Sequence, residues 1–333
     1  MASKAAESRL DVARDRLAQC VERVTRLDKP SIGHDLIGLW GPDLADGVVA
    51  SRLVKHLKKT REVDPVVRRD TTIQKMIDHD KGGLSAFDYR ALPLRERRNF
   101  LLAKNALESF SRHIRRLNSF RFPSGETVHP SQGDTDFIAK LVDGDQWRVS
   151  FEAASDAAAI LYQTRALRCV VKERFRALYP HWRFIADTWF SETGNRFQVF
   201  KRMFVACCTI QNYSRLSTAP KNSEIDRPIS MEPMFNMMVQ LSFAADLRAA
   251  LESCYGFHLE SRAQLHRTLI KHPNKVTIDL RNASNSNWFC VIKQLWPKSL
   301  VKCLERMRTP VCYYKGQYHY YNMLAPMGCG FTF

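Results

Sequence analysis

The sequence has no long hydrophobic run. None of its apolar stretches approaches the ~18 residues that a transmembrane helix needs, so we expect no membrane span. The first residues, 1–17 (MASKAAESRLDVARDRL), are charged from the start and lack the apolar segment of a secretory leader. These absences predict a protein of the cytoplasm.

Paired-cysteine and metal-binding motifs are also missing. The chain has nine cysteines, but no C-x-x-C pair, and their number is odd. We interpret them as reduced and mostly buried thiols. The one H-x-E motif, His258 with Glu260, is not followed by P-C-x-x-C, which excludes a zinc deaminase. No H-x-x-x-H pair, P-loop or nucleophile elbow occurs, so zinc-protease, P-loop and hydrolase signatures are absent.

Acidic residues are few relative to basic ones. Asp and Glu number 34 against 51 Lys and Arg, which gives a net charge of +17. Such a charge favours a polyanionic partner, nucleic acid first and an anionic membrane surface second, although a basic soluble protein without such a partner is an open alternative. Because the basic residues recur along the chain, they suit a long groove better than a tail. The clusters lie at 55–61, 68–69, 95–98, 112–121 and 165–183.

The sequence does contain enough apolar material for a folded core. Its 333 residues are 45% hydrophobic and 11% aromatic, which is typical of a globular protein with two or more lobes. Residues 120–137 are predicted to form a loop and 143–151 a turn into a strand, while 63–98 show no clear pattern. Helices without regular β-α-β alternation predict an α+β fold. The predicted helices span 7–28, 32–62, 99–117, 153–178 and 231–254.

One segment combines a strand pattern with a carboxylate at its end. Residues 276–286 read VTIDLRNASNS, in which the run 276–278 is followed by Asp279. A buried strand that ends in Asp places a hard oxygen ligand where hydrated Mg²⁺ can reach it. Two-metal phosphoryl transfer needs at least two such carboxylates from different segments. Asp279 is thus a candidate catalytic and metal-binding residue, although an Asp also ends many ordinary strands.

Two basic residues upstream suit a triphosphate. Lys221 and Arg227 lie in 218–233 (TAPKNSEIDRPISMEP), a Pro-bounded segment that predicts an extended strand and turn. Cations at such a place can bind the triphosphate of an incoming nucleotide. The alternative is a surface ion pair of Arg227 with Asp226 or Glu224.

A glycine-containing block lies at 327–333 (MGCGFTF). Gly328 and Gly330 allow the backbone to approach a ligand closely or to adopt a positive φ, and Thr332 adds a hydroxyl group. An ordinary turn is the alternative. The acidic DGD at 143–145 superficially resembles a metal-binding turn, but it precedes a strand pattern, so we predict a surface hairpin there.

With these motifs the chain resembles the replicase catalytic (beta) subunit family, the RNA-dependent RNA polymerases of leviviruses, which are small single-stranded RNA bacteriophages. The resemblance implies a right-hand α+β polymerase with fingers and a partial palm. It also implies an RNA template and nascent strand, ribonucleoside triphosphates and Mg²⁺. The resemblance runs through five blocks in the same order: PKNSEIDRPISMEPMFNMMVQL (220–241), LR (247–248), TIDLRNASNS (277–286), LERMRTP (304–310) and MGCGFTF (327–333).

The resemblance assigns roles to single residues. Asp279 matches the first metal-binding aspartate of the palm, and Lys221 and Arg227 match the fingers motif over the entering nucleotide. Gly328 through Thr332 match the start of the loop that contacts the template and the nascent base pair. The family has a second Asp six residues after the first, where this chain has Asn285. We expect Asn285 to bind the nucleotide ribose with altered stringency.

The implied domain division and the end of the chain follow from the same resemblance. The family's Gly-Asp-Asp turn, with the other metal ligands, and its thumb are expected beyond residue 333, so this C-terminally truncated chain is expected to bind RNA or nucleotide weakly and not to polymerise. The implied regions are a helical N-terminal region or fingers (1–120), fingers with the nucleotide-entry motif (121–260), palm (261–295), fingers–palm connection (296–326) and the start of the Gly-x-Gly loop (327–333).

Partners follow by analogy alone. The family acts in the host bacterial cytoplasm with elongation factors Tu and Ts and a ribosomal protein, and without a membrane. The alternative function is a non-enzymatic, basic RNA-binding protein, which explains the charge but not the ordered blocks. A reverse transcriptase would carry a bulky aromatic residue shortly after the palm Asp, and residues 281–285 include none.

Overall fold

The computed structural model of the protein describes residues 65–114, 119–123, 127, 140–141, 147–221, 226–272, 274–276 and 282–331. The chain divides into two compact units, Met1–Glu62 with Asn222–Glu224, and Val63–Lys221 with Ile225–Phe333. The helices predicted at 7–28 and 32–62 lie outside the described residues. Within the described part, no helix combines the length and the hydrophobicity of a membrane span.

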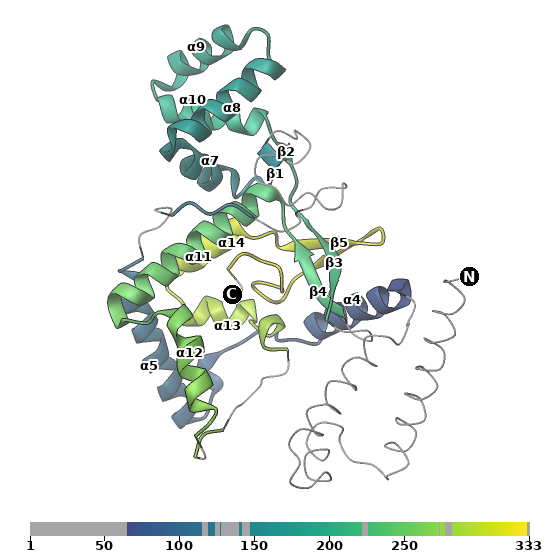
Figure 1. Ribbon diagram of the computed structural model, residues 1–333, viewed down its shortest axis with the longest axis vertical. Coiled ribbons are helices and arrows are strands. Elements are labelled where there is room, and N and C mark those ends of the chain that lie inside the picture. Colours follow the sequence, from purple (N-terminus) through teal and green to yellow (C-terminus); the bar gives the residue numbers. More distant parts are fainter. Residues whose placement is uncertain are drawn as a thin grey trace, which may run out of the picture. The chain divides into compact units, whose positions relative to one another are not determined.

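The described residues form a helix-rich mixture of helices and short strands, in agreement with the predicted α+β class (Figure 1). The helices are α4 (Pro65–Lys81), α5 (Leu94–Ser111), α7 (Ala154–Gln163), α8 (Arg165–Leu178), α9 (Trp182–Thr193), α10 (Arg196–Ala206), α11 (Met234–Tyr255), α12 (Leu259–Leu269), α13 (Phe289–Leu295) and α14 (Lys298–Met307), with 3₁₀ turns η1 (Tyr89–Ala91) and η3 (Ala283–Asn285). The strands are β1 (Arg148–Val149), β2 (Thr209–Ile210), β3 (Ser214–Pro220), β4 (Asp226–Met231), β5 (Val311–Tyr314) and β6 (Gln317–Tyr320).

Four of these strands form one sheet in the order β4-β3-β5-β6. The hairpins β3–β4 and β5–β6 are antiparallel, and they are joined by a parallel pairing of β3 with β5. The extended strand predicted within 218–233 is confirmed, because β3 ends and β4 begins in this segment. The residues between the two strands, 222–225, lie outside the described residues. Strands β1 and β2 form a separate parallel pair.

Helix α4 covers one face of the four-stranded sheet (Figure 1). Its residues Ile73, Met76 and Ile77 recur at helical spacing and are buried together with Leu216 of β3 and Cys312 of β5. Sequence reasoning left this region unassigned. The helix is largely polar, so its narrow apolar stripe gives a weak periodic signal.

A larger core lies among helices α7, α8, α10, α11 and α14. Trp147, just before β1, is buried in it and meets the ring of Phe235 edge-on, with centroids 5.3 Å apart and an angle of 82° between the planes. Phe204 meets Phe235 in the same way at 4.8 Å. Such edge-to-face pairs contribute ~0.5–1.5 kcal/mol beyond the burial of their area.

The single helix predicted over 153–178 is wrong, because the structure has two helices there. Thr164 is extended (φ −101°, ψ 124°) and separates α7 from α8. Helix α8 buries only the stripe Leu167, Val171 and Phe175. Both helices pack against α10. One straight helix could not turn both apolar faces toward the same neighbour, so the chain bends at Thr164.

The other helix predictions fare better. The helix predicted over 231–254 is confirmed as α11, and the helix predicted over 99–117 is confirmed over 99–111 as part of α5. The strand predicted within 143–151 is the two-residue β1. The described cysteines are free thiols, and four of the eight are buried, fewer than predicted. Burial raises the pKa of Cys207, one of these four, to about 11.

Candidate functional site

Lys221 and Arg227 lie at the same end of the β3–β4 hairpin. Lys221 directly follows β3, and Arg227 is the second residue of β4, where it pairs with Ala219. Both residues are exposed. By the alternation of strand side chains, Arg227 points to the same face as Ile229, away from α4. The structure thus brings the two predicted cations to one exposed end of the sheet.

Asp226 is not the ion-pair partner of Arg227. Its Oδ1 lies 2.9 Å from Nε of Arg68 in α4, on the opposite face of the sheet. Glu224, the other partner considered, lies outside the described residues. No carboxylate in the described part of the chain forms an ion pair with Lys221 or Arg227. Their charge is therefore not neutralised by a described neighbour.

Asn285 ties two of the sequence blocks together. It is 7% exposed, and its Oδ1 accepts a hydrogen bond from the backbone N–H of Met327 at 3.2 Å. Nearby, Asn287 Nδ2 donates to Ala325 O and Asn287 Oδ1 accepts from Ala325 N, both at 2.8 Å. Asn282 makes the tight entry to this turn with a φ of 57°. The 282–287 loop is thus fixed to the segment just before the glycines.

Gly328 and Gly330 approach the protein's own backbone closely. Gly328 has a φ of +105°, and a Cβ there would lie 2.5 Å from Ser230 O and 2.7 Å from Cγ2 of Ile229 in β4. A Cβ at Gly330 would lie 2.9 Å from Cβ of Gln240, and its N–H donates to Gln240 Oε1 at 2.8 Å. A positive φ, one of the two conformational possibilities predicted for this block, is present at Gly328, and the close contacts of both glycines are with β4 and α11 of the protein itself. A template contact stays a prediction.

The predicted palm strand has its decisive residues outside the described part of the chain. Asp279 and Thr332 both lie outside the described residues, so the structure does not test their predicted roles. Val276 is described, and it is 88% exposed and not part of a strand. The expectation that a buried strand begins at Val276 was therefore wrong. A turn at the end of α12, with Lys275 N donating to His272 O at 3.1 Å, leaves Val276 in solvent.

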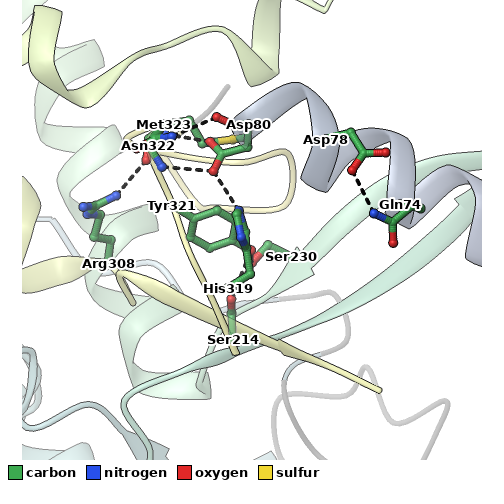
Figure 2. Close-up of polar contacts among 10 residues, drawn as sticks. All are labelled: Gln74, Asp78, Asp80, Ser214, Ser230, Arg308, His319, Tyr321, Asn322 and Met323. Atoms are coloured by element: carbon green, nitrogen blue, oxygen red, sulfur yellow. Dashed lines mark hydrogen bonds and ion pairs between the residues drawn. The ribbon is translucent and has the colours of Figure 1, made fainter. Parts of the chain in front are cut away.

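Asp80 fixes the loop that contains Asn322 and Met323, on the α4 side of the sheet (Figure 2). This residue was not singled out from the sequence. It is fully buried at the end of α4, and its carboxylate accepts from the backbone N–H groups of Asn322 (3.0 Å) and Met323 (2.9 Å). His319 Nε2 lies 2.8 Å from Asp80 Oδ2. Asn322 Nδ2 donates back to Asp80 O at 2.9 Å. No spacing rule in the sequence joins Asp80 to residues more than 200 positions away.

Glu232, between β4 and α11, contacts the glycine block (327–333) through Cys329. It is fully buried; its Oε2 accepts from Thr309 Oγ1 at 2.9 Å, and its Oε1 accepts from Cys329 Sγ at 3.3 Å. Burial raises the pKa of Glu232 from 4.5 to about 7, against the lowering effect of these hydrogen bonds. Cys329 lies between the two glycines, so Glu232 contacts the glycine block directly.

The described residues contain no group of three or more His, Cys, Asp or Glu side chains that could hold a metal ion. The buried carboxylates Asp80 and Glu232 are both occupied by protein donors. The described part of the chain therefore does not fit a Mg²⁺ site by itself. The only predicted ligand, Asp279, lies outside it.

The second part of the chain is similar in sequence to a family of phage proteins. Residues 192–333 match the family described as RNA replicase, beta-chain. The RNA-directed RNA polymerase subunit beta of Escherichia virus Qbeta is 32% identical over 129 residues, which cover 37% of this chain and 22% of that protein. The RNA-directed RNA polymerase beta chain of Enterobacteria phage GA is 33% identical over 121 residues, which cover 35% of this chain and 23% of that protein. The beta chain of Escherichia phage MS2 is 32% identical over 120 residues, covering 35% and 22%. The matches thus span less than a quarter of these relatives' length.

Proposed function

We propose that this chain, whose residues 192–333 match the RNA replicase beta-chain family, supplies the nucleotide-entry part of an RNA-directed RNA polymerase. In this proposal Lys221 and Arg227 bind the triphosphate of the incoming ribonucleotide. The proposal also includes template-directed RNA synthesis by the polymerase of which this chain is a part, with its RNA template and nascent strand. It further includes the host elongation factors Tu and Ts and a ribosomal protein as partners. Action in the cytoplasm of an infected bacterium and the predicted division into fingers and palm belong to it as well.

The observation that supports this proposal best is the meeting of three sequence blocks. Gly328 packs on β4 two positions from Arg227, because a Cβ on it would touch Ile229, which shares a face with Arg227. Asn285 bonds the backbone at Met327, next to Gly328. The basic, amide and glycine blocks thus adjoin one another, as a site that binds the different parts of a nucleotide requires.

Asn285 has a chemically defined role in the proposal. Its Oδ1 is used by Met327 N–H, whereas Nδ2 has no acceptor among the described residues. An amide N–H can donate to the oxygen of a ribose 2′-hydroxyl, whereas a carboxylate at this position would accept from its hydrogen. We therefore propose that Asn285 recognises the ribose through Nδ2.

Magnesium enters the proposal only through Asp279. When bound, the ion would neutralise phosphate charge. Since the described residues form no metal cluster, no step is derived through the ion. What the described residues do is electrostatic: two cations at one end of a hairpin, in a protein with a net charge of +17, favour the binding of a polyphosphate.

Nucleotide binding by the purified 333-residue chain tests the proposal. Calorimetric titration with ATP in the presence of Mg²⁺ is expected to show saturable binding. Arg227→Ala and Lys221→Ala should each weaken it ~10-fold or more, since each removes a charge-assisted contact. Asn285→Ala should reduce the preference for ATP over dATP. Asp279→Asn should reduce the dependence of binding on Mg²⁺.

Two exposed cations elsewhere serve as matched controls. Arg196, at the start of α10, and Lys302, on α14, are exposed like the two candidates, and their Ala variants should bind ATP as the parent does. Equal effects at all four positions would mean that net charge alone attracts the nucleotide. Salt-sensitive RNA binding without an ATP site would instead favour the non-enzymatic RNA-binding protein.

A further inference from the structure

The two faces of the four-stranded sheet carry different residues. Successive strand residues point to opposite faces, and α4 packs on the face that carries Leu216 and Cys312. The residues between these positions therefore point to the other face. The pairing register places four of them in one row across the sheet: Met231 of β4, Arg215 of β3, Tyr313 of β5 and Tyr318 of β6.

Tyrosine rings gather on that face. The centroids of Tyr313 and Tyr318 lie 5.1 Å apart, and Tyr213, just before β3, contacts both rings at 5.8 and 5.5 Å. Tyr318 is 59% exposed, and Tyr320, on the same face of β6, is 74% exposed. The contacts within the cluster restrict the rings, while the exposed fraction leaves surface for a flat partner.

Positive charge accompanies these rings. Arg215 is the register partner of Tyr313, and Arg227 is exposed on the same face of β4. The only acidic residue within these four strands, Asp226, points to α4 and meets Arg68 there. This face therefore combines aromatic surface with cations, and its strands place no carboxylate on it.

We propose that this tyrosine face (Tyr213, Tyr313, Tyr318 and Tyr320, with Arg215) binds single-stranded RNA. Bases stack on the exposed rings of Tyr318 and Tyr320, and phosphates contact Arg215, as on other aromatic and basic surfaces that bind single strands. The choice of RNA rests on the proposed function. The proposed RNA contacts do not include the nucleotide-binding cations, since Arg215 lies about 13 Å along β3 from the residue opposite Arg227, at the other end of the same face.

RNA binding by the whole chain tests this assignment. We suggest fluorescence anisotropy with a labelled oligouridylate of about ten nucleotides, a length within the usual site size of such surfaces. Tyr318→Ala and Tyr320→Ala should each weaken binding about tenfold, because each removes a stacked base. The salt dependence should stay the same, because no phosphate contact is lost. Tyr320→Phe keeps the ring and should bind as the parent does.

Tyr255 on α11 is the matched control, because it is also 59% exposed. Tyr255→Ala should leave RNA affinity unchanged, and circular dichroism should show that all variants are folded. Blunt-ended duplex RNA should be insensitive to the tyrosine variants, because its bases are already stacked. The proposal would be overturned if Tyr318→Ala and Tyr320→Ala bound single-stranded RNA as tightly as Tyr255→Ala does, which is the result expected if this face binds an acidic protein instead. It would also be overturned if these two variants lost as much affinity for duplex RNA as for single-stranded RNA. If the tyrosine variants lose RNA affinity but the parent chain does not bind ATP, only the proposed nucleotide site is overturned.

Discussion

The two faces of the β4-β3-β5-β6 sheet use polar residues in opposite ways. On the face under α4, Ser230 Oγ donates to Ser214 Oγ at 2.8 Å and accepts from the Tyr321 hydroxyl at 3.1 Å. Burial raises the pKa of Tyr321 well above its usual value, so its hydroxyl stays protonated and can donate. On the opposite face, Tyr318 and Tyr320 present their rings to solvent.

Strand β6 shows most directly what this difference teaches. It reads QYHY, and its residues alternate between the two faces. His319 belongs to a residue type that often acts in catalysis, but here it contacts the buried Asp80 and helps to fix a loop. Its neighbours Tyr318 and Tyr320 are the candidates for binding. The face on which a residue stands therefore says more about its role here than its chemical type does.

The largest effect expected on the buried side is that of Asp80→Ala. The substitution leaves the N–H groups of Asn322 and Met323 without their acceptor in a buried place (Figure 2). Buried donors that lose a charged partner cost ~3–5 kcal/mol. We expect the free energy of unfolding, measured by urea titration followed by circular dichroism, to fall by that amount.

Asp78 provides the matched control for Asp80, two residues earlier in α4. Its carboxylate accepts only an exposed hydrogen bond from Gln74 at 2.8 Å (Figure 2). Asp78→Ala should change the free energy of unfolding by no more than ~0.5 kcal/mol. Tyr320→Ala on the open face should do the same. Equal losses for Asp80→Ala and Tyr320→Ala would break the comparison between the faces.

Glu232 extends the comparison to pH. Its pKa is about 7 in the folded protein and near 4.5 when exposed, so the folded state holds the proton more tightly. The stabilisation from this proton is complete below pH 4.5 and is lost as the pH rises toward 7, and it amounts to ~3 kcal/mol in total.

Glu232→Gln isolates this contribution, because glutamine stays neutral at every pH. Between pH 4.5 and 7, the free energy of unfolding of the parent should fall relative to that of the variant. From pH 7.5 to 9 the difference between the two should stay constant. Urea titrations at five pH values measure it. A difference that does not change with pH would show that Glu232 is not the titrating group.

Gly328→Ala tests the close contact between the glycine block and β4, on the face of the sheet opposite α4. The new Cβ would meet Ser230 O at 2.5 Å, on a backbone with a φ of +105°. We expect the free energy of unfolding to fall by ~2 kcal/mol or more, from the clash and from the strained φ together.

Gly316, in the β5–β6 turn, separates these two causes. It also has a positive φ, +81°, but a Cβ there would have nothing within 4 Å. Gly316→Ala should therefore cost only the backbone strain, ~1 kcal/mol. If both substitutions cost the same in thermal and urea unfolding, the packing of Gly328 on β4 contributes nothing.

Local patterns predicted those parts of the fold whose cause is local. The apolar composition of 231–254 predicts a helix that the structure confirms as α11, and prolines bound the strand and turn of β3 and β4. The helix over 153–178 was wrong, because its bend at Thr164 depends on how α7 and α8 both reach α10. The residue type of Gly328 predicted its positive φ, whereas nothing in the local sequence pointed to the contacts of Asp80.

By itself, the sequence determined the helix-rich mixed fold, the excess of positive charge, the glycine block and the family that residues 192–333 match. Only the tertiary structure decided that Asn285 meets Met327, that Asp80 binds a loop far along the chain, and that burial raises the pKa of Glu232. The physical reason is the same in each case. Side-chain pattern and backbone preference act over a few residues, whereas burial and hydrogen bonding depend on which distant segments pack together.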